Sequence, residues 1–359
     1  MNTVTVKPRD KIRVKPGVQG VKLGPAAKRA QDYATDQEVR WCPGCGDYSI
    51  LRAVQLAFAE QDVAAENTVF VSGIGCSSRF PYYMETYGFH TIHGRAPTIA
   101  TGVKLANPEL DVWVVTGDGD ALSIGGNHLM HALRRNIGLN ILLFNNEIYG
   151  LTKGQYSPTS SAGTVSPSSP GGSIDTPLSA GLYALGSGAQ FIARAVDTDI
   201  NGLKAVVTDA KAHEGASLVE IFQNCLVFND KTFGQFTDPD VALDQQLHVK
   251  HGEPLLFGKA FGQDGCKGLV FNPTSLSIQV VDLAADEDAI KGVLVHDETN
   301  PTLAQLLLSM TPPALPVALG VVYRNPKAAF ETLYWQQNAT KHKTKSVDEL
   351  LNSGQIWQR

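Results

Sequence analysis

Between about residues 40 and 235, short apolar runs alternate with longer stretches that have a helical pattern. The apolar runs are rich in β-branched residues and occupy residues 67–73, 111–117, 140–146, 191–196 and 217–222. The helical stretches cover residues 47–60, 98–107, 125–136, 177–188 and 200–215. Short buried strands separated by helices are typical of a doubly wound, mainly parallel α/β sheet, which we predict for residues 36–235. Ligands bind such sheets at the carboxyl ends of the strands.

The alternating pattern is missing from both ends of the chain. Residues 1–30 contain eight Lys or Arg and one acid, Asp10, and we predict residues 1–35 to form a basic arm that is solvated or partner-bound. A transit peptide is disfavoured, because the arm lacks Ser and an amphipathic stripe. Residues 236–359 contain strand-like runs only at 291–296 and 316–323, so we predict an extension that docks on the core or on a neighbouring subunit.

One segment within the α/β region differs from its surroundings in composition. Residues 154–175 are rich in Ser, Pro and Gly and almost free of hydrophobic residues. Such a composition is typical of a flexible linker. Because the segment directly follows a predicted strand end, a mobile loop over a binding site is an equally good interpretation.

The overall composition changes this picture little. The 359 residues are 43% hydrophobic and 18% charged, which is ordinary for a globular enzyme. The formal net charge of −5 at pH 7 gives no reason to expect a nucleic acid partner. The sequence contains no run of 18 apolar residues and no signal-type segment, so we predict a cytoplasmic protein that does not enter a membrane.

Four of the five cysteines form a first candidate site. Cys42 and Cys45 lie in WCPGCGDY, Cys76 in SGIGCSSR and Cys225 in IFQNCLVF. Four thiolates can hold an iron–sulfur cluster or a structural zinc ion, whereas a thioredoxin-like dithiol would use only the C-x-x-C pair. A cluster tolerates the scattered spacing better, because its iron corners face different directions. Cys266 is predicted to be a passive thiol outside this set.

A second candidate site lies between the third and fourth of these cysteines. GDGD occupies residues 117–120 at the end of one predicted strand, and NNEIYG occupies residues 145–150 at the end of the next. Magnesium prefers oxygen ligands, which the Asp118 carboxylate, the Asn146 amide and the backbone carbonyl of Ile148 can supply. The two motifs together resemble the thiamine diphosphate signature, although GDG alone also fits a strand–helix turn without a ligand.

Two histidine pairs suggest a metal site more weakly. His90 and His93 have H-x-x-H spacing, but nothing nearby in the sequence completes a tetrahedral zinc site. His128 and His131 are expected to be ordinary residues of the helix that follows GDGD.

Taken together, the motifs resemble the β subunits of 2-oxoacid:ferredoxin oxidoreductases. The resemblance rests on WCPGCGDY, SGIGCSSR, HGRAPTIATGVKLANP, GDGDALSIGGNHLMHALRRN, NNEIYGLTKGQYSPT and the later lone cysteine, in collinear order over roughly residues 40–230. It implies one [4Fe–4S] cluster close to a thiamine ring, held by Cys42, Cys45, Cys76 and Cys225. It also implies that the cofactor is lined by Ile74, Gly75, Cys76, Ser77, His93, Gly94, Arg95, Gly119, Asp120 and Gly150.

The resemblance assigns two further residues to the substrate and indicates a missing subunit. Arg79 matches a basic position that contacts the substrate carboxylate, and Leu151 lies beside the substrate pocket. Thiamine activation needs a glutamate that normally comes from a separate pyrimidine-binding domain, which this sequence lacks. It also lacks the C-x-x-C-x-x-C run of ferredoxin-type clusters. We therefore expect half of an active site, which an α subunit completes in an α2β2 complex.

The implied reaction is the reversible oxidative decarboxylation of a 2-oxoacid with coenzyme A, with electrons passing through the cluster to ferredoxin. The overall pattern favours 2-oxoglutarate, giving succinyl-CoA and CO2, while pyruvate and branched-chain oxoacids stay open. Two alternatives from other classes explain only part of the sequence. A non-oxidative thiamine-dependent decarboxylase or synthase has no use for four cysteines, and a zinc-stabilised assembly subunit has no use for Asp118 and Asn146.

Overall fold

The computed structural model describes residues 29–260, 263–284, 287–339, 346–355 and 357, so most of the predicted basic arm lies outside the described residues. An eight-stranded sheet forms the centre, with the strand order β2-β1-β3-β4-β8-β7-β13-β9. Neighbouring strands are parallel except β7 and β13, which are antiparallel. The prediction of a doubly wound, mainly parallel α/β sheet is confirmed.

The bounds of the elements agree well with the hydrophobic pattern. The strands of the central sheet are β1 Thr68–Ser72, β2 Tyr87–His90, β3 Asp111–Gly117, β4 Asn140–Asn145, β7 Phe191–Val196, β8 Ser217–Phe222, β9 Gln246–Val249 and β13 Val317–Arg324. The helices are α1 Asp47–Glu60, α2 Ala96–Ala106, α3 Gly126–Arg134, α4 Ala180–Gly186, α5 Ile200–Ala212, α6 Gly234–Thr237, α7 Pro239–Gln245, α8 Pro301–Leu308, α9 Phe330–Ala339 and α10 Val347–Leu351. All predicted strands and helices up to residue 222 are present, whereas β2 was missed because its four residues are exposed and carry no apolar run.

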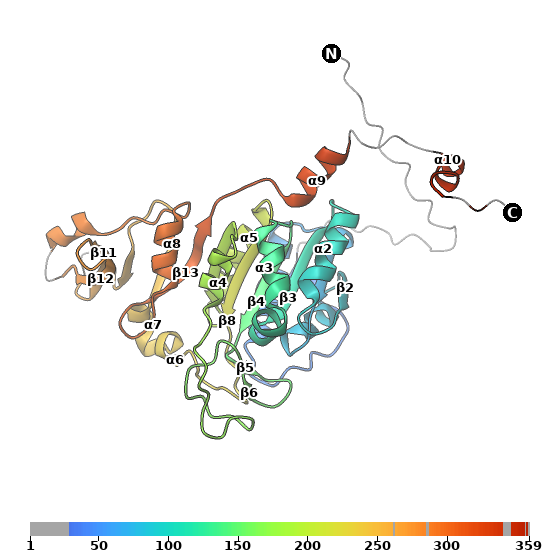
Figure 1. Cartoon of the computed structure of the whole chain (residues 1–359). Helices are drawn as coiled ribbons and strands as arrows, with labels where there is room; N and C mark the ends of the chain where they lie inside the picture. The colour runs from blue at the N-terminus through green and yellow to red at the C-terminus, as the bar shows by residue number, and fades with distance from the viewer. Residues whose placement is uncertain (1–28, 261–262, 285–286, 340–345, 356, 358–359) are drawn as a thin grey trace, which may run out of the picture.

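Helices cover both faces of the sheet (Figure 1). Val112 and Val114 of β3 pack on the face that α2, α3, α4 and α8 cover. Trp113 and Val115, which point the other way, pack against α1 and α5. Because both faces are buried, the strands appear in the sequence as continuous apolar runs rather than as alternating ones.

Residues beyond 235 contribute to the same sheet and also form a smaller one. The predicted strand at 316–323 is present as β13, and β9 pairs with it at the edge of the central sheet. The small antiparallel sheet consists of β10 Leu256–Gly258, β11 Cys266–Asn272 and β12 Ser277–Asp282. A division of the chain at residue 235 stays a prediction.

The predicted strand at 291–296 is wrong. Its first two residues end a 3-10 helix, Glu287–Gly292, and Val293 and Val295 make only isolated bridges. Val293 is buried in the core of the small sheet, beside Cys266. The apolar run therefore reflects burial of a connection and not pairing along a continuous strand.

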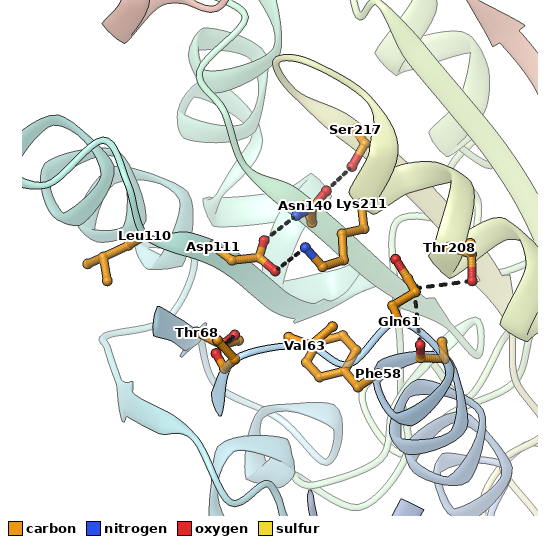
Figure 2. A network of polar contacts seen from close by, with 12 residues as sticks. Phe58, Gln61, Val63, Thr68, Leu110, Asp111, Asn140, Thr208, Lys211 and Ser217 are labelled. Carbon is orange, nitrogen blue, oxygen red and sulfur yellow. Dashed lines mark hydrogen bonds and ion pairs between the residues drawn. The ribbon is translucent and has the colours of Figure 1, made fainter. Parts of the chain in front are cut away.

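A polar network joins the amino ends of the central strands (Figure 2). The Asn140 amide donates to the Asp111 carboxylate at 3.0 Å, and the Ser217 hydroxyl donates to the Asn140 amide oxygen at 2.9 Å. Lys211 of α5 lies 3.1 Å from the same carboxylate. Asp111, Asn140 and Ser217 begin β3, β4 and β8, so this network ties three neighbouring strands and one helix together.

Within the described part of the chain, no helix has the length and apolar character needed to cross a membrane.

Candidate cofactor site

A cavity with about 560 Å3 of empty space, part of it open to solvent, lies at the carboxyl ends of β1, β3 and β4. Many of the predicted site residues line it: Ile74, Gly75, Cys76, Ser77, His93, Asp118, Gly119, Asp120, Asn146, Ile148, Gly150 and Leu151. The lining also includes Asp47, Phe144, Tyr149, Thr152 and Gln223, which the sequence motifs did not single out. The topology thus brings the two predicted motifs to one hollow at the sheet edge, where ligands of α/β sheets bind.

Asp118 follows the last residue of β3, and its side chain is buried. The hydroxyls of Ser157 and Thr159 both donate to its Oδ2 atom, at 2.5 and 2.6 Å. Burial raises the pKa of the Asp118 carboxyl, and these two hydrogen bonds partly offset that effect. Through Ser157 and Thr159, segment 154–175 therefore contacts the site, in agreement with the interpretation as a loop over a binding site. The mobility of this loop stays a prediction.

The paired asparagines face different surroundings. Asn146 lines the cavity, and its amide donates to the Gln223 side chain at 2.9 Å. Asn145 is buried behind it, where its amide donates to Glu220 at 2.9 Å and its oxygen lies 3.0 Å from the Thr159 hydroxyl. Only the second asparagine is therefore placed as a candidate metal ligand.

Asp120 acts as a hub for two separate loops. Its carboxylate accepts hydrogen bonds from the Thr116 hydroxyl at 2.6 Å and from the backbone N–H groups of Gly94 and Ile74 at 2.7 and 3.1 Å. It also contacts the His93 ring. These bonds hold the IGCS and HGR segments against the end of β3, so Asp120 shapes the cavity wall.

Glycine is required at residue 119 by a close approach of an aromatic ring. The Tyr149 hydroxyl donates to the Gly119 carbonyl at 3.1 Å, and a Cβ atom at residue 119 would lie 2.2 Å from the Tyr149 ring. The second motif thereby packs directly on the first.

The cysteines gather next to the cavity. A Cβ atom at residue 150 would lie 3.5 Å from the Cys76 sulfur and 3.7 Å from the Cys225 sulfur, so the glycine there leaves room between them. The Gln223 amide lies 3.4 Å from the Cys45 sulfur, and Cys42 is exposed. Burial raises the pKa of the Cys76 thiol to about 12.

The spacing of these sulfurs bears on the kind of metal centre. Among the described residues, no group of three or more His, Cys, Asp or Glu side chains is placed to surround a single metal ion. In a [4Fe–4S] cluster each thiolate binds a different iron atom, so its ligands enclose a larger body than one zinc ion does. As placed, the described side chains do not surround one zinc ion, and the kind of centre that the cysteines hold stays a prediction.

Three predicted residues lie outside the cavity lining and have other partners. Arg79 donates to the Tyr83 hydroxyl at 3.1 Å from the 3-10 helix Ser77–Tyr83 and does not line the cavity. Arg95 contacts His128. His90 bonds to the Ser72 hydroxyl at 3.0 Å, and so it is not paired with His93.

Sequence reasoning missed a buried carboxylate in the cavity wall. Asp47, at the first turn of α1, is 1% exposed, and neither of its oxygens has a hydrogen-bond partner among the described residues. Burial raises the pKa of its carboxyl to about 7. Its position directly after C-P-G-C-G was the available signal.

Comparisons with known proteins assign the family. Residues 73–221 match the family described as thiamine pyrophosphate enzyme, C-terminal TPP binding domain. The chain is 47% identical over 347 residues to 2-oxoglutarate oxidoreductase subunit KorB of Mycobacterium tuberculosis, covering 94% of this chain and 90% of that protein. It is 43% identical over 211 residues to 2-oxoacid:ferredoxin oxidoreductase 1, subunit beta, of Aeropyrum pernix, covering 59% of this chain and 66% of that one. The chain belongs to the β subunits of the 2-oxoacid:ferredoxin oxidoreductases.

A solved structure agrees with this family assignment. The 2-oxoglutarate:ferredoxin oxidoreductase from Magnetococcus marinus, with 2-oxoglutarate, coenzyme A and succinyl-CoA bound, matches with a TM-score of 0.73 at 29% identity. The match covers 91% of this chain and 96% of that chain. The predicted family, fold and oxidoreductase class are confirmed, and membership among β subunits implies a partner subunit.

Proposed function

We propose that this β subunit, together with an α subunit, converts 2-oxoglutarate and coenzyme A to succinyl-CoA and CO2 and passes the electrons to ferredoxin. The main support for this proposal is that one cavity is lined both by Asp118, Asn146 and Ile148, whose oxygens suit magnesium, and by the Cys76 sulfur. The names of the relatives and the ligands of the M. marinus enzyme support 2-oxoglutarate as the substrate.

The residues of the cavity divide the work. Asp118, Asn146 and the Ile148 carbonyl would hold a magnesium ion, which would supply positive charge for the diphosphate of thiamine diphosphate. When bound, thiamine diphosphate supplies the electron sink that decarboxylation of a 2-oxoacid requires. The Asp120 hub fixes the IGCS and HGR loops at the cavity wall.

The cysteines and the residues at the cavity mouth have separate roles. Cys42, Cys45, Cys76 and Cys225 hold one [4Fe–4S] cluster, which gives the site a one-electron carrier next to the cofactor. We also assign substrate contacts to Arg79, which bonds to Tyr83 outside the cavity lining, and to the half-exposed Leu151 within that lining. We assign the reaction to the cytoplasm and to an α2β2 complex in which the α subunit supplies the glutamate that activates the thiamine.

Low-temperature EPR of the anaerobically purified complex tests this proposal. A reduced-cluster signal should appear on addition of 2-oxoglutarate with coenzyme A. A larger signal with pyruvate or a branched-chain oxoacid would change the substrate and keep the reaction. Absence of any cluster signal, even after dithionite, would overturn the redox function.

A pair of cysteine variants sharpens the assignment of the cluster. Cys225→Ala should lose most of the protein-bound iron, because it removes one of four thiolates. Cys266→Ala is the matched control, since this buried cysteine lies in the small sheet, and it should keep the iron content of the wild type. Equal iron content in both variants would contradict the assigned ligand set.

A further inference from the structure

Residues 157–160 form a short buried turn against the cavity floor. Ser157, Thr159 and Ser160 are 2, 4 and 4% exposed, although their segment is composed like a surface loop. The turn is closed by a hydrogen bond from the Ser157 N–H to the Ser160 hydroxyl at 2.8 Å. It is anchored by a hydrogen bond from the Leu178 N–H to the Pro158 carbonyl at 2.8 Å and by a contact of Ser160 with the Glu147 carbonyl.

The turn presents two hydroxyls to a single oxygen of the Asp118 carboxylate. Ser157 and Thr159 both bond to Oδ2, the backbone N–H groups of Asp118 and Gly119 also bond to the carboxylate, and no side chain among the described residues donates to Oδ1. One oxygen of this carboxylate is thus committed to the protein, while the residue lines the cavity. A carboxylate held through one oxygen can offer the other to a metal in a fixed direction.

Thr159 lies against a chain of buried side chains. Its hydroxyl lies 3.0 Å from the Asn145 oxygen, and the Asn145 amide donates to Glu220 at 2.9 Å. Because Glu220 offers only acceptors, it fixes which end of the Asn145 amide faces Thr159. Glu220 in turn pairs with Arg194 at 2.8 Å, and all four side chains are buried.

We propose that Ser157 and Thr159 are positioning residues that aim the Asp118 carboxylate at the magnesium ion. This inference rests on the proposed function, since it presumes that Asp118 binds magnesium. The two asparagines of the NN pair are placed differently: Asn146 lines the cavity, and Asn145 is buried beside Thr159. Removal of a group that orients a metal ligand costs about 10–100-fold in metal affinity.

The role of the Thr159 hydroxyl is tested by calorimetric titration with Mg2+. The complex is first stripped of metal and cofactor, and thiamine diphosphate is then added back to saturation. Thr159→Val keeps the shape of the side chain and removes the hydroxyl, so the Kd for Mg2+ should rise by about 10–100-fold. Thr159→Ser retains the hydroxyl and should restore most of the affinity. Thr164→Val is the control: the Thr164 hydroxyl bonds to the Ser161 carbonyl of the same loop at 2.6 Å and does not touch Asp118.

Two further readouts separate positioning from a general effect on the loop. The iron content of the magnesium-free complex should be the same for Thr159→Val and Thr164→Val, whereas the thermal midpoint should fall more in Thr159→Val, because its hydroxyl is buried. At saturating Mg2+, the KM for 2-oxoglutarate should be unchanged in Thr159→Val. Should this variant fold poorly, Ser157→Ala removes the other hydroxyl and should weaken Mg2+ binding in the same direction.

The outcomes distinguish this inference from the proposed function. Wild-type Mg2+ affinity in Thr159→Val, or equal weakening in Thr159→Ser, would overturn the positioning role and leave the proposed function intact. A wild-type complex that binds no thiamine diphosphate at any Mg2+ concentration would overturn the proposed function and, with it, the positioning role.

Discussion

The two ends of β3, β4 and β8 carry similar polar residues but surround different spaces. At the amino ends, Asn140 bridges Asp111 and Ser217, and the three side chains satisfy one another (Figure 2). At the carboxyl ends, Asn145 makes an equivalent bridge between Thr159 and Glu220. The chemistry of the two bridges is nearly the same, so polar residues at strand ends do not by themselves define a site.

The two ends differ in what surrounds the bridging asparagine: a closed polar network at the amino ends and a cavity at the carboxyl ends. At the amino ends, the Lys211 side chain of α5 lies against Asp111 and completes a closed network. At the carboxyl ends, the glycine-containing motifs after β1 and β3 leave a cavity that Asp118 and Asn146 line. Gly150, which also lines this cavity, lies beside the Cys76 and Cys225 sulfurs.

The largest expected effect comes from Asp118→Ala at the carboxyl edge. Loss of a direct metal ligand should exceed the roughly 10–100-fold effect of losing an orienting group, so the complex should show no measurable Mg2+-dependent binding of thiamine diphosphate. Calorimetric titration measures this loss. Retention of cofactor binding would mean that the two edges differ less than their geometry indicates.

At the amino edge, Asn140→Ala should lower the stability of the fold and leave cofactor binding unchanged. It leaves Asp111 and Ser217 without their shared partner, and an unsatisfied buried polar group costs about 1–3 kcal/mol of the free energy of unfolding. Thiamine diphosphate affinity should stay at the wild-type value, because the cavity lies at the other ends of the strands. Denaturant titration and calorimetry provide the two readouts.

A matched control for this variant lies nearby. Gln61→Ala removes a half-buried side-chain amide that donates a long hydrogen bond, 3.3 Å, to the Thr208 hydroxyl. Because this bond is long and only partly buried, the variant should destabilise the fold less than Asn140→Ala. A loss of cofactor affinity in Asn140→Ala would show that the amino edge controls the site and would undo the comparison.

The smallest effect concerns pH and also belongs to the amino edge. His213 follows α5, packs against the Phe191 ring at 5.2 Å and has no hydrogen-bond partner for its ring nitrogens among the described residues. Burial, assisted by the charge of Arg324, lowers the pKa of His213 to about 4. Between about pH 6.5 and 4, only the unfolded chain takes up this proton, so stability should decrease as the pH falls.

Replacement of this histidine isolates its contribution. Allowing for its partial exposure, the loss amounts to about 1–2 kcal/mol of the free energy of unfolding. His213→Gln cannot titrate, and its free energy of unfolding should change less than that of the wild type between pH 7 and 4.5. Parallel pH dependence in both proteins would assign the acid sensitivity to other groups.

The sequence by itself determined the class of the sheet and the order of its motifs. Strands buried on both faces must be apolar along their whole length, so β1, β3, β4, β7 and β8 were visible as runs. The strand-end positions of Asp118 and Asn146 followed from the same pattern, because a parallel sheet brings its carboxyl ends to one edge. The collinear motifs also sufficed to indicate the family.

The tertiary structure decided which polar groups meet. Thr159 lies 41 residues from Asp118, and Glu220 lies 75 residues from Asn145, so no local periodicity predicts these bonds. For the same reason the sequence did not reveal that β9 and β13 extend the central sheet or that Asp47 faces the cavity. Hydrophobic burial is encoded residue by residue along each element, whereas hydrogen-bond partners are chosen only when distant elements have packed together.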